Sequence, residues 1–316
     1  MSFELPDPKV PVFPGVNDSP IAPTALTAGN GAHLIQQHNL LVDILNFTLN
    51  APSEPNSYPS LNKVLTEDIT LYVDSANGND NNDGLSAETA FISLQKASAI
   101  AASYFNPFNC NRIIKLLSGF YGETYLTGYR NSLRRENILI LGNYDNPETV
   151  VINEPLYHQG GGLYEIQGVT FTTFSNNSCL EISNSRLQLR KVQFTGEASI
   201  HIYAINQALI EILDNYTIAG SATDSHIKLD SFSHLDFFGK EDWNRDININ
   251  NDLAFANFVS LTRNSYLSAK CNNFSNSAIG NKFLADGNSV IDTDGENINL
   301  FPGDVPGILT KNSHYF

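Results

Sequence analysis

Short runs of alternating apolar and polar residues recur between residues 113 and 292. The runs are IIKLL (113–117), ILIL (138–141), LYEI (163–166), RLQL (186–189), ALIEI (208–212), HLDFF (234–238), YLSA (266–269) and SVID (289–292). Alternation with a period of two is typical of a strand that buries one face. With one apolar residue of each run as its anchor, most anchors lie about 22–26 residues apart, which is the repeat length of a solenoid. The anchors are Leu116, Ile140, Leu163, Leu187, Leu209, Leu235, Leu267 and Val290.

The segments between the runs decide between solenoid and other all-β folds. A jelly roll or a propeller would place Asn-Gly hairpin turns between paired strands every 8–12 residues or so. Such turns are scarce here, and Asn, Ser, Asp and Gly mark corners instead. One coil cannot bury its own inner face, so stacked coils must share a core. We therefore predict a parallel β-helix.

Other elements are expected on both sides of the repeat. Residues 69–73 (ITLYV) predict a strand, and residues 91–104 predict an amphipathic helix with Leu94, Ala97, Ile100 and Ala101 on one face. Together with the repeat they predict a body over residues 67–300. Residues 301–316 are expected to form an irregular C-terminal tail.

The N-terminal part of the chain has a different pattern. Residues 1–31 are rich in proline, which fixes φ and lacks an N–H, and they predict an extended arm, with a floppy terminus as the alternative. Residues 32–50 carry apolar residues at coiled-coil spacing and predict a short helical stem. The stem must associate with copies of itself or dock on the body, because it is too short to be stable alone. Residues 51–66 predict a linker. The expected seam consists of Ile35, His38, Val42, Leu45 and Leu49.

Composition and charge argue against several classes of function. The net charge is −15, with 18 Lys+Arg against 33 Asp+Glu, so partners with a phosphate backbone and anionic membrane surfaces are not expected. No apolar run is long enough to span a bilayer. The start of the chain lacks the basic and apolar regions of a secretory signal peptide. The cysteines Cys110, Cys179 and Cys271 form neither a disulfide framework nor a zinc motif.

The segment 71–91 (LYVDSANGNDNNDGLSAETAF) followed by ISLQKA (92–97) resembles the entry motif of the pectate-lyase-like superfamily. In that superfamily a first strand and a capping helix close one end of a right-handed parallel β-helix. The resemblance covers about 27 residues of motif and, through the repeat, about 180 more. It implies the fold more than the activity, since the superfamily includes lyases, hydrolases, adhesins and tailspikes.

A second resemblance concerns the N-terminal region. The arm, the segment 28–35 (AGNGAHLI) and the stem pattern look like the attachment end of phage tail fibres and tailspikes. This implies a homotrimer that is held on the baseplate by residues 1–50 and binds a host cell-surface polysaccharide. The expected location is the virion, with folding in the host cytoplasm and no signal peptide.

The loop at 74–84 offers several oxygen ligands of the kind that calcium prefers. The candidate metal ligands are Asp74, Asn79, Asp80 and Asp83. The alternative, which we favour, is a hydrogen-bonded turn that caps the solenoid.

The step of 32 residues from Leu235 to Leu267 exceeds the repeat and predicts a loop near residues 238–251. Insertions in solenoids often form the binding face. This loop contains Trp243, the only tryptophan, together with Glu241, Asp242 and Arg245. An aromatic ring among polar side chains is a suitable platform for a sugar. The structural alternative is that Trp243 packs the loop against the solenoid or against a neighbouring chain.

A polysaccharide hydrolase or lyase on the same scaffold is the second hypothesis, and it needs a pair of carboxylates. The candidate catalytic residues are Glu211, Asp236, Glu241 and Asp242. Counted from their anchors, Glu211 and Asp236 are expected on different faces of the wall. A bacterial surface adhesin is a third hypothesis. The segment YHQGGG (157–162) is interpreted as a glycine turn between coils.

Overall fold

A computed structural model describes residues 63–105, 110–129, 137–174, 176–237, 245–269, 272–295, 298 and 300–316. The chain divides into two units, Met1–Asn62 and Lys63–Phe316, and the described residues belong to the second. The predicted arm (1–31) and stem (32–50) lie outside the described residues. Within the predicted linker (51–66), Lys63–Val64 forms strand β1, which pairs with β3 (Tyr104–Phe105).

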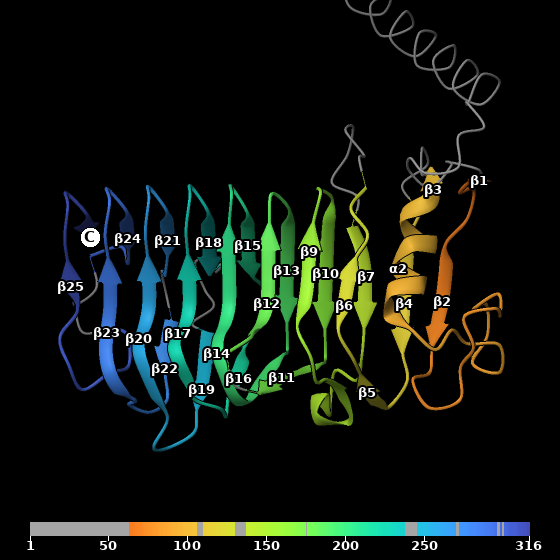
Figure 1. Cartoon of the computed structure of the whole chain (residues 1–316), viewed down its shortest axis with the longest axis horizontal. Helices are drawn as coiled ribbons and strands as arrows, with labels where there is room; N and C mark the ends of the chain where they lie inside the picture. Colours follow the sequence, from red (N-terminus) through yellow and green to blue (C-terminus); the bar gives the residue numbers. More distant parts are fainter. Residues whose placement is uncertain are drawn as a thin grey trace, which may run out of the picture. The chain divides into compact units, whose positions relative to one another are not determined.

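Ten parallel strands form the first sheet, with neighbouring strands one coil apart (Figure 1). All eight predicted runs and the predicted strand 69–73 belong to this sheet, which confirms the repeat. The strands are β2 (Ile69–Val73), β4 (Arg112–Leu116), β7 (Asn137–Leu141), β10 (Leu163–Gln167), β13 (Arg186–Arg190), β15 (Leu209–Ile212), β18 (His234–Phe237), β21 (Tyr266–Ser268), β24 (Val290–Asp292) and β26 (His314–Tyr315).

The coils that start with β4 to β21 continue into a second and a third sheet, and the long strand β14 (Gln193–Ile205) belongs to both. The second sheet also holds β5 (Gly119–Tyr121), β8 (Val150–Ile152), β11 (Thr170–Phe174), β16 (Tyr216–Ile218), β19 (Arg245–Ile249) and β22 (Asn272–Phe274). The third sheet also holds β6 (Thr124–Leu126), β9 (Leu156–Gln159), β12 (Ser178–Ser183), β17 (Ala222–Leu229), β20 (Ala254–Leu261), β23 (Ile279–Ala285) and β25 (Ile308–Leu309). The short 3₁₀ helix η2 (Pro147–Thr149) precedes β8.

The stacked coils make a parallel β-solenoid of about seven turns. Every strand pair among the described residues is parallel, which excludes the jelly roll and the propeller, both of which are built from antiparallel strands. The prediction of a parallel β-helix is therefore confirmed.

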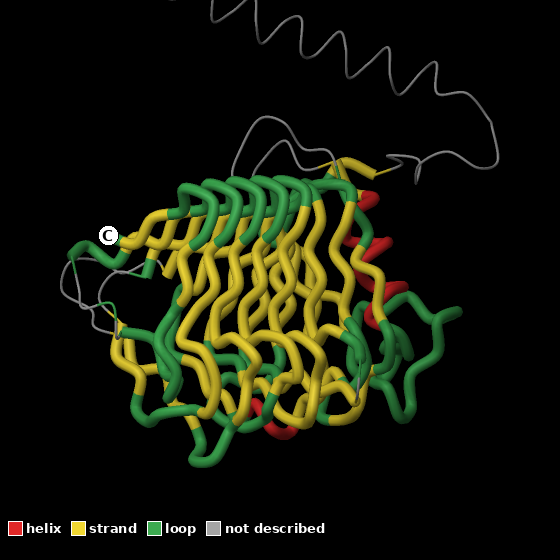
Figure 2. Tube along the Cα trace, turned by 60° about the vertical axis from the view of Figure 1, so that its left-hand side comes forward, coloured by secondary structure: helices red, strands yellow, loops and turns green. Residues whose placement is uncertain are grey.

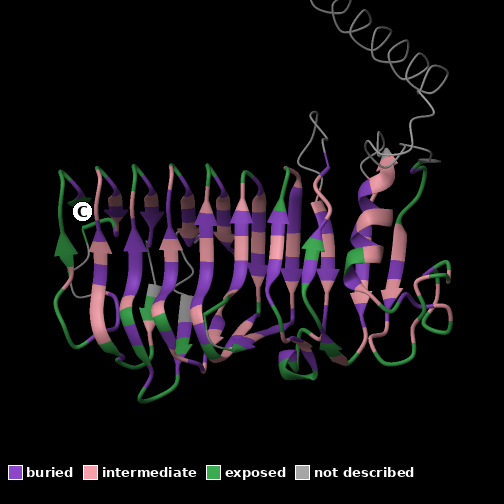
Figure 3. Ribbon diagram, viewed as in Figure 1, coloured by how far each residue is buried: buried purple, intermediate pink, exposed green. Residues whose placement is uncertain are grey.

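The core consists of apolar side chains stacked from coil to coil. In the first sheet Ile114, Ile140, Ile166 and Leu189 lie in register, each one coil beyond the last. Along first-sheet strands such as β4, β7 and β13, buried residues alternate with partly exposed ones (Figure 3). Because successive strands are in register, their outward residues form columns on the surface. These columns are candidate positions for a binding or catalytic site.

Among the described residues, three fully buried histidines interrupt the aliphatic core. His201 on β14 and His226 on β17 face each other with 2.9 Å between their Nδ1 atoms, and the Tyr216 hydroxyl lies 2.9 Å from His226 Nε2. His158 lies on β9, with its Nε2 atom 3.4 Å from the Gly162 carbonyl oxygen. Burial lowers the pKa of His158 to about 4 and that of His201 to about 3, and it holds the pKa of His226 well below its ordinary value.

The corners between the third and first sheets repeat an Asn-Ser pair. The asparagines adopt the left-handed conformation that turns the chain, and the serines are buried beneath the turn. These corner turns are aligned from coil to coil (Figure 2). The pairs are Asn184-Ser185, Asn264-Ser265, Asn288-Ser289 and Asn312-Ser313.

The buried serines link neighbouring coils. Ser289 Oγ donates to the Asp286 carbonyl (2.7 Å) and accepts from the Ser265 backbone N–H (3.2 Å) of the coil before. Ser313 Oγ accepts in the same way from the Ser289 N–H at 3.1 Å. The ladder therefore satisfies backbone groups that the turn leaves without sheet partners.

We expect Ser289→Ala to lower the free energy of unfolding by about 2 kcal/mol, because the buried Ser265 N–H and the part-buried Asp286 carbonyl lose their hydrogen bonds to the hydroxyl. Urea unfolding followed by circular dichroism measures the change. Ser183→Ala is the matched control, since the Ser183 hydroxyl accepts a hydrogen bond from Asn206 in an exposed setting, and it should change stability by less than about 0.5 kcal/mol. Equal effects of the two substitutions would contradict the role of the ladder.

Helix α2 (Leu94–Ser103) packs against β2, β4 and β6 near the N-terminal edge of the first sheet. It buries Leu94, Ala97, Ala101 and Ala102, and the small alanines allow close packing; the predicted Ile100 is only partly buried. Ser93 caps the helix by accepting from the Lys96 N–H at 3.2 Å. Both the strand and the helix of the predicted entry motif are thus present.

The C-terminal residues 301–316 are not an irregular tail. They supply β25 to the third sheet and β26 to the first, and Phe301 is fully buried in the core. The prediction was wrong because strands of two residues are too short to show alternation. Among the described helices, none is long and apolar enough to cross a bilayer.

Candidate functional site

The outward face of the first sheet carries a column of polar side chains, which we call the polar column. One residue comes from each of six successive coils, each in register with the next. The polar column consists of Glu165, Gln188, Glu211, Asp236, Ser268 and Asp292. Four of its six members are carboxylates.

Glu211 and Asp236 are direct neighbours in this column. The expectation that they lie on different faces was wrong. The anchor Leu209 is an outward residue in register with His234, whereas Ile210 is the buried residue in register with Leu235. A displacement of one residue exchanges the two faces of a strand. The two candidate carboxylates are therefore attached to adjacent strands, about 4.8 Å apart along the solenoid.

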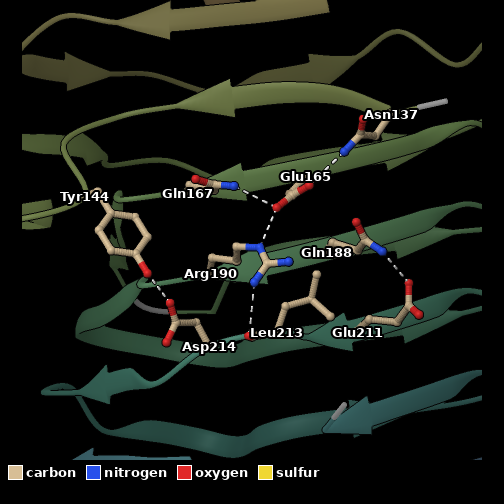
Figure 4. Close-up of polar contacts among 9 residues, drawn as sticks. All are labelled: Asn137, Tyr144, Glu165, Gln167, Gln188, Arg190, Glu211, Leu213 and Asp214. Carbon is tan, nitrogen blue, oxygen red and sulfur yellow. Dashed lines mark hydrogen bonds and ion pairs between the residues drawn. The ribbon is translucent and has the colours of Figure 1, made fainter. Parts of the chain in front are cut away.

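Glu165 is the most heavily hydrogen-bonded member (Figure 4). It accepts from Asn137 Nδ2 at 2.7 Å, from Gln167 Nε2 at 2.7 Å and from Arg190 Nε at 2.6 Å. Arg190 also donates to the Leu213 carbonyl at 3.3 Å. These contacts join four coils and leave Glu165 little capacity for a ligand.

Glu211 is held more lightly. Its Oε2 atom accepts from Gln188 Nε2 at 2.8 Å and lies 3.6 Å from the Arg186 guanidinium (Figure 4). Beside the column, the Tyr144 hydroxyl donates to Asp214. Among the described residues, no hydrogen bond or ion pair engages the Asp236 carboxylate.

An imidazole and a phenol flank Asp236. The rings of His234 and Tyr266 meet edge to face with centroids 4.7 Å apart, and the Tyr266 hydroxyl donates to Asp292 at 2.7 Å. Burial lowers the pKa of His234, while the carboxylates of Asp236 and Glu211 oppose that shift. Burial and then the bond to Asp292 raise the pKa of Tyr266 to about 12. Both rings are thus neutral near pH 7.

Glu211, Asp236, His234 and Tyr266 form a cluster of acceptors and rings on the wall. Such a cluster can accept hydrogen bonds from hydroxyl groups, and its two adjacent carboxylates are the groups that glycoside cleavage uses. The hollows of about 580 and 660 Å³ found among the described residues lie elsewhere, beside α2 and at the Asn206 corner.

The loop with the predicted calcium ligands uses its oxygens internally. Asp74 accepts from the Ala76 and Asn77 N–H groups, and Asp83 accepts from the Leu85 N–H and the Thr89 hydroxyl. These hydrogen bonds lower the pKa of both carboxyl groups. The largest contribution comes from the Ala76 N–H for Asp74 and from the Thr89 hydroxyl for Asp83.

The other two predicted ligands are bonded in the same way. Asp80 accepts from the N–H groups of Ile92 and Ser93 and from the Ser93 hydroxyl, and so anchors the start of α2. Asn79 accepts from the Asn81 N–H. Within the described ranges no three His, Cys, Asp or Glu side chains are grouped as a metal site. Calcium binding stays a prediction.

The predicted sugar loop is only partly described. Glu241, Asp242 and Trp243 lie outside the described residues, and so does the side chain of Arg245. Contrary to the prediction of a loop throughout, Arg245–Ile249 forms β19 of the second sheet. The predicted glycine turn is confirmed: Gly160, Gly161 and Gly162 all have φ near +90°, and His158 is buried.

No protein-family model matches the chain, and no curated protein matches it in sequence. The likeness to pectate-lyase-like proteins therefore depends on the solenoid and the entry motif alone.

Proposed function

We propose that this protein is a subunit of a phage tail fibre or tailspike that binds a host-surface polysaccharide along the outward face of its first sheet. Residues 1–50 attach it to the baseplate and form the stem of a homotrimer, and its location is the virion. The fold and the sequence pattern support this proposal.

The observation that carries the proposal is the polar column with its partly unengaged centre. Polysaccharides repeat their hydroxyl groups along a line, and the solenoid repeats acceptors along a line at about 4.8 Å. Asp236 and the lightly held Glu211 offer lone pairs that the protein leaves open, and His234 and Tyr266 offer ring surface beside them.

Binding to surface polysaccharide from candidate bacterial hosts, measured together with the size of the product chains, tests the proposal. Asp236→Asn and Glu211→Gln are expected to weaken binding about tenfold each, because hydrogen bonds to carboxylates are among the strong ones. Glu148→Gln removes the same charge from exposed η2, away from the column, and should leave affinity unchanged. Wild-type affinity in both column variants would contradict the proposed face.

The adjacency of Glu211 and Asp236 favours one alternative, a glycoside hydrolase on the same scaffold. One carboxyl group would protonate the leaving oxygen, and the other would attack or activate water; the coil spacing is close to the short separation of retaining enzymes. Shortened product chains would establish this activity. Asp236→Asn would then reduce the cleavage rate by about 10²-fold or more while Glu148→Gln would not.

A further inference from the structure

A second column runs along the outward face of the third sheet, on the strands β6, β9, β12, β14 and β17 (Figure 1). Successive pairs in this column are in register. Its members are Tyr125, Tyr157, Glu181, Tyr203 and Lys228. A carboxylate thus stands between two tyrosines, one coil away on either side.

Glu181 is a half-buried carboxylate with no hydrogen bond or ion pair among the described residues. Burial raises its pKa. Partial burial of an anion is unfavourable unless a partner compensates it, and the part of the chain that the structure describes supplies none.

The surroundings of Glu181 favour a positively charged partner. Burial and Tyr125, followed by the carboxylates of Glu181, Glu123 and Glu154, raise the pKa of Tyr157, so the negative charges of all three act on that ring. The negative potential of three carboxylates and two tyrosine rings attracts cations.

The column already contains one cation–ring contact. Lys228, one coil beyond Tyr203, places its Nζ atom 5.9 Å from the centre of that ring. Asp224 holds the same ammonium at 2.6 Å, so Lys228 is already paired and does not serve Glu181. The opposite neighbour of Tyr203 in the column is Glu181, which forms no ion pair with a described cationic side chain.

We propose that Glu181, Tyr157 and Tyr203 form a binding site for an organic ammonium group. The carboxylate pairs with the charge, and the two tyrosines contact the alkyl groups around it. At the end of the column, Tyr125 stacks on Tyr157 with centroids 4.7 Å apart and fixes that ring.

Isothermal titration calorimetry of the full chain with choline at low ionic strength tests this site. Choline should bind, and 3,3-dimethylbutan-1-ol, which has the same shape without the charge, should not. Glu181→Gln is expected to weaken choline binding about tenfold and Tyr203→Leu about fivefold. Glu197→Gln, an equal charge change at an exposed position of β14, should alter it less than about twofold.

Three results would overturn the proposal. These are no choline binding, equal binding of choline and its neutral analogue, and wild-type affinity in Glu181→Gln. Glucosamine and N-acetylglucosamine, titrated in parallel, show whether an amino sugar can supply the ammonium. The ammonium site does not depend on the proposed function. Failure of the proposed function would appear as unchanged polysaccharide binding in the Asp236 and Glu211 variants, and it would not change choline binding.

Discussion

Lowering the pH from 7.5 to 5 is expected to destabilise the solenoid by about 2 kcal/mol for each of its three core histidines, because all three are neutral in the folded state. A histidine whose folded pKa is depressed binds protons more readily when the chain is unfolded. The stabilisation is therefore complete above the ordinary pKa of 6.5 and is lost as the pH falls below it. The pH range over which this stabilisation is lost extends down to the folded-state pKa, which is about 4 for His158 and about 3 for His201.

The geometry of the His201–His226 pair also predicts that protonation destabilises the fold. One Nδ1 atom must donate and the other accept across 2.9 Å. Protonation of the accepting ring would set two N–H groups against each other inside an apolar core. Between pH 6.5 and 5 the carboxylates of Asp74, Asp83 and Asp286 contribute little to the slope, since hydrogen bonds lower their pKa below the ordinary 3.8.

Urea unfolding at a series of pH values measures this slope. The double variant His201→Phe/His226→Phe should lose about half to two thirds of it, whatever its absolute stability, because two of the three core histidines are gone and half-buried His234, whose pKa burial also lowers, adds a smaller part. His314→Gln changes an exposed histidine on β26 and is the control. An unchanged slope in the double variant would contradict the assignment of the pH dependence to the core histidines.

The first sheet could be predicted from the sequence because each of its longer strands buries one face and therefore alternates. The second and third sheets could not be found in the same way. Most strands of the second sheet are short, and the longer strands of the third sheet contain register shifts that break the alternation or, like β14, run through a corner without a break. A better signal was present in the Asn-Ser pairs at 264–265, 288–289 and 312–313, which lie 24 residues apart. The last pair would have extended the solenoid to the C-terminus.

The candidate site was predictable in its residues and not in its register. Glu211 and Asp236 were identifiable as acids on neighbouring coils, but apolar Leu209 occupies an outward position and misled the assignment of faces. Side-chain direction on a strand depends on a single residue of register, so a sequence without a register marker leaves it open. The contribution of His234 and Tyr266 follows only from that register.

The aromatic part of the core suggests the largest effect of a single substitution. Phe194 is fully buried and contacts four rings, with centroid distances of 5.5 Å to Phe171, 5.4 Å to His201, 6.0 Å to Tyr216 and 5.5 Å to His226. Phe194→Ala would remove a ring that links the core side chains of successive coils.

We expect Phe194→Ala to lower the free energy of unfolding by about 4 kcal/mol, because a cavity replaces a buried ring that rigid neighbouring strands cannot fill. Phe174→Ala is the matched control, since Phe174 lies on the adjacent coil and is 71% exposed, and it should change stability by less than about 0.5 kcal/mol. Urea and thermal unfolding of both variants measure the difference. A small effect of Phe194→Ala would mean that the coils collapse onto the cavity, and so that the solenoid core is more deformable than its parallel ladders suggest.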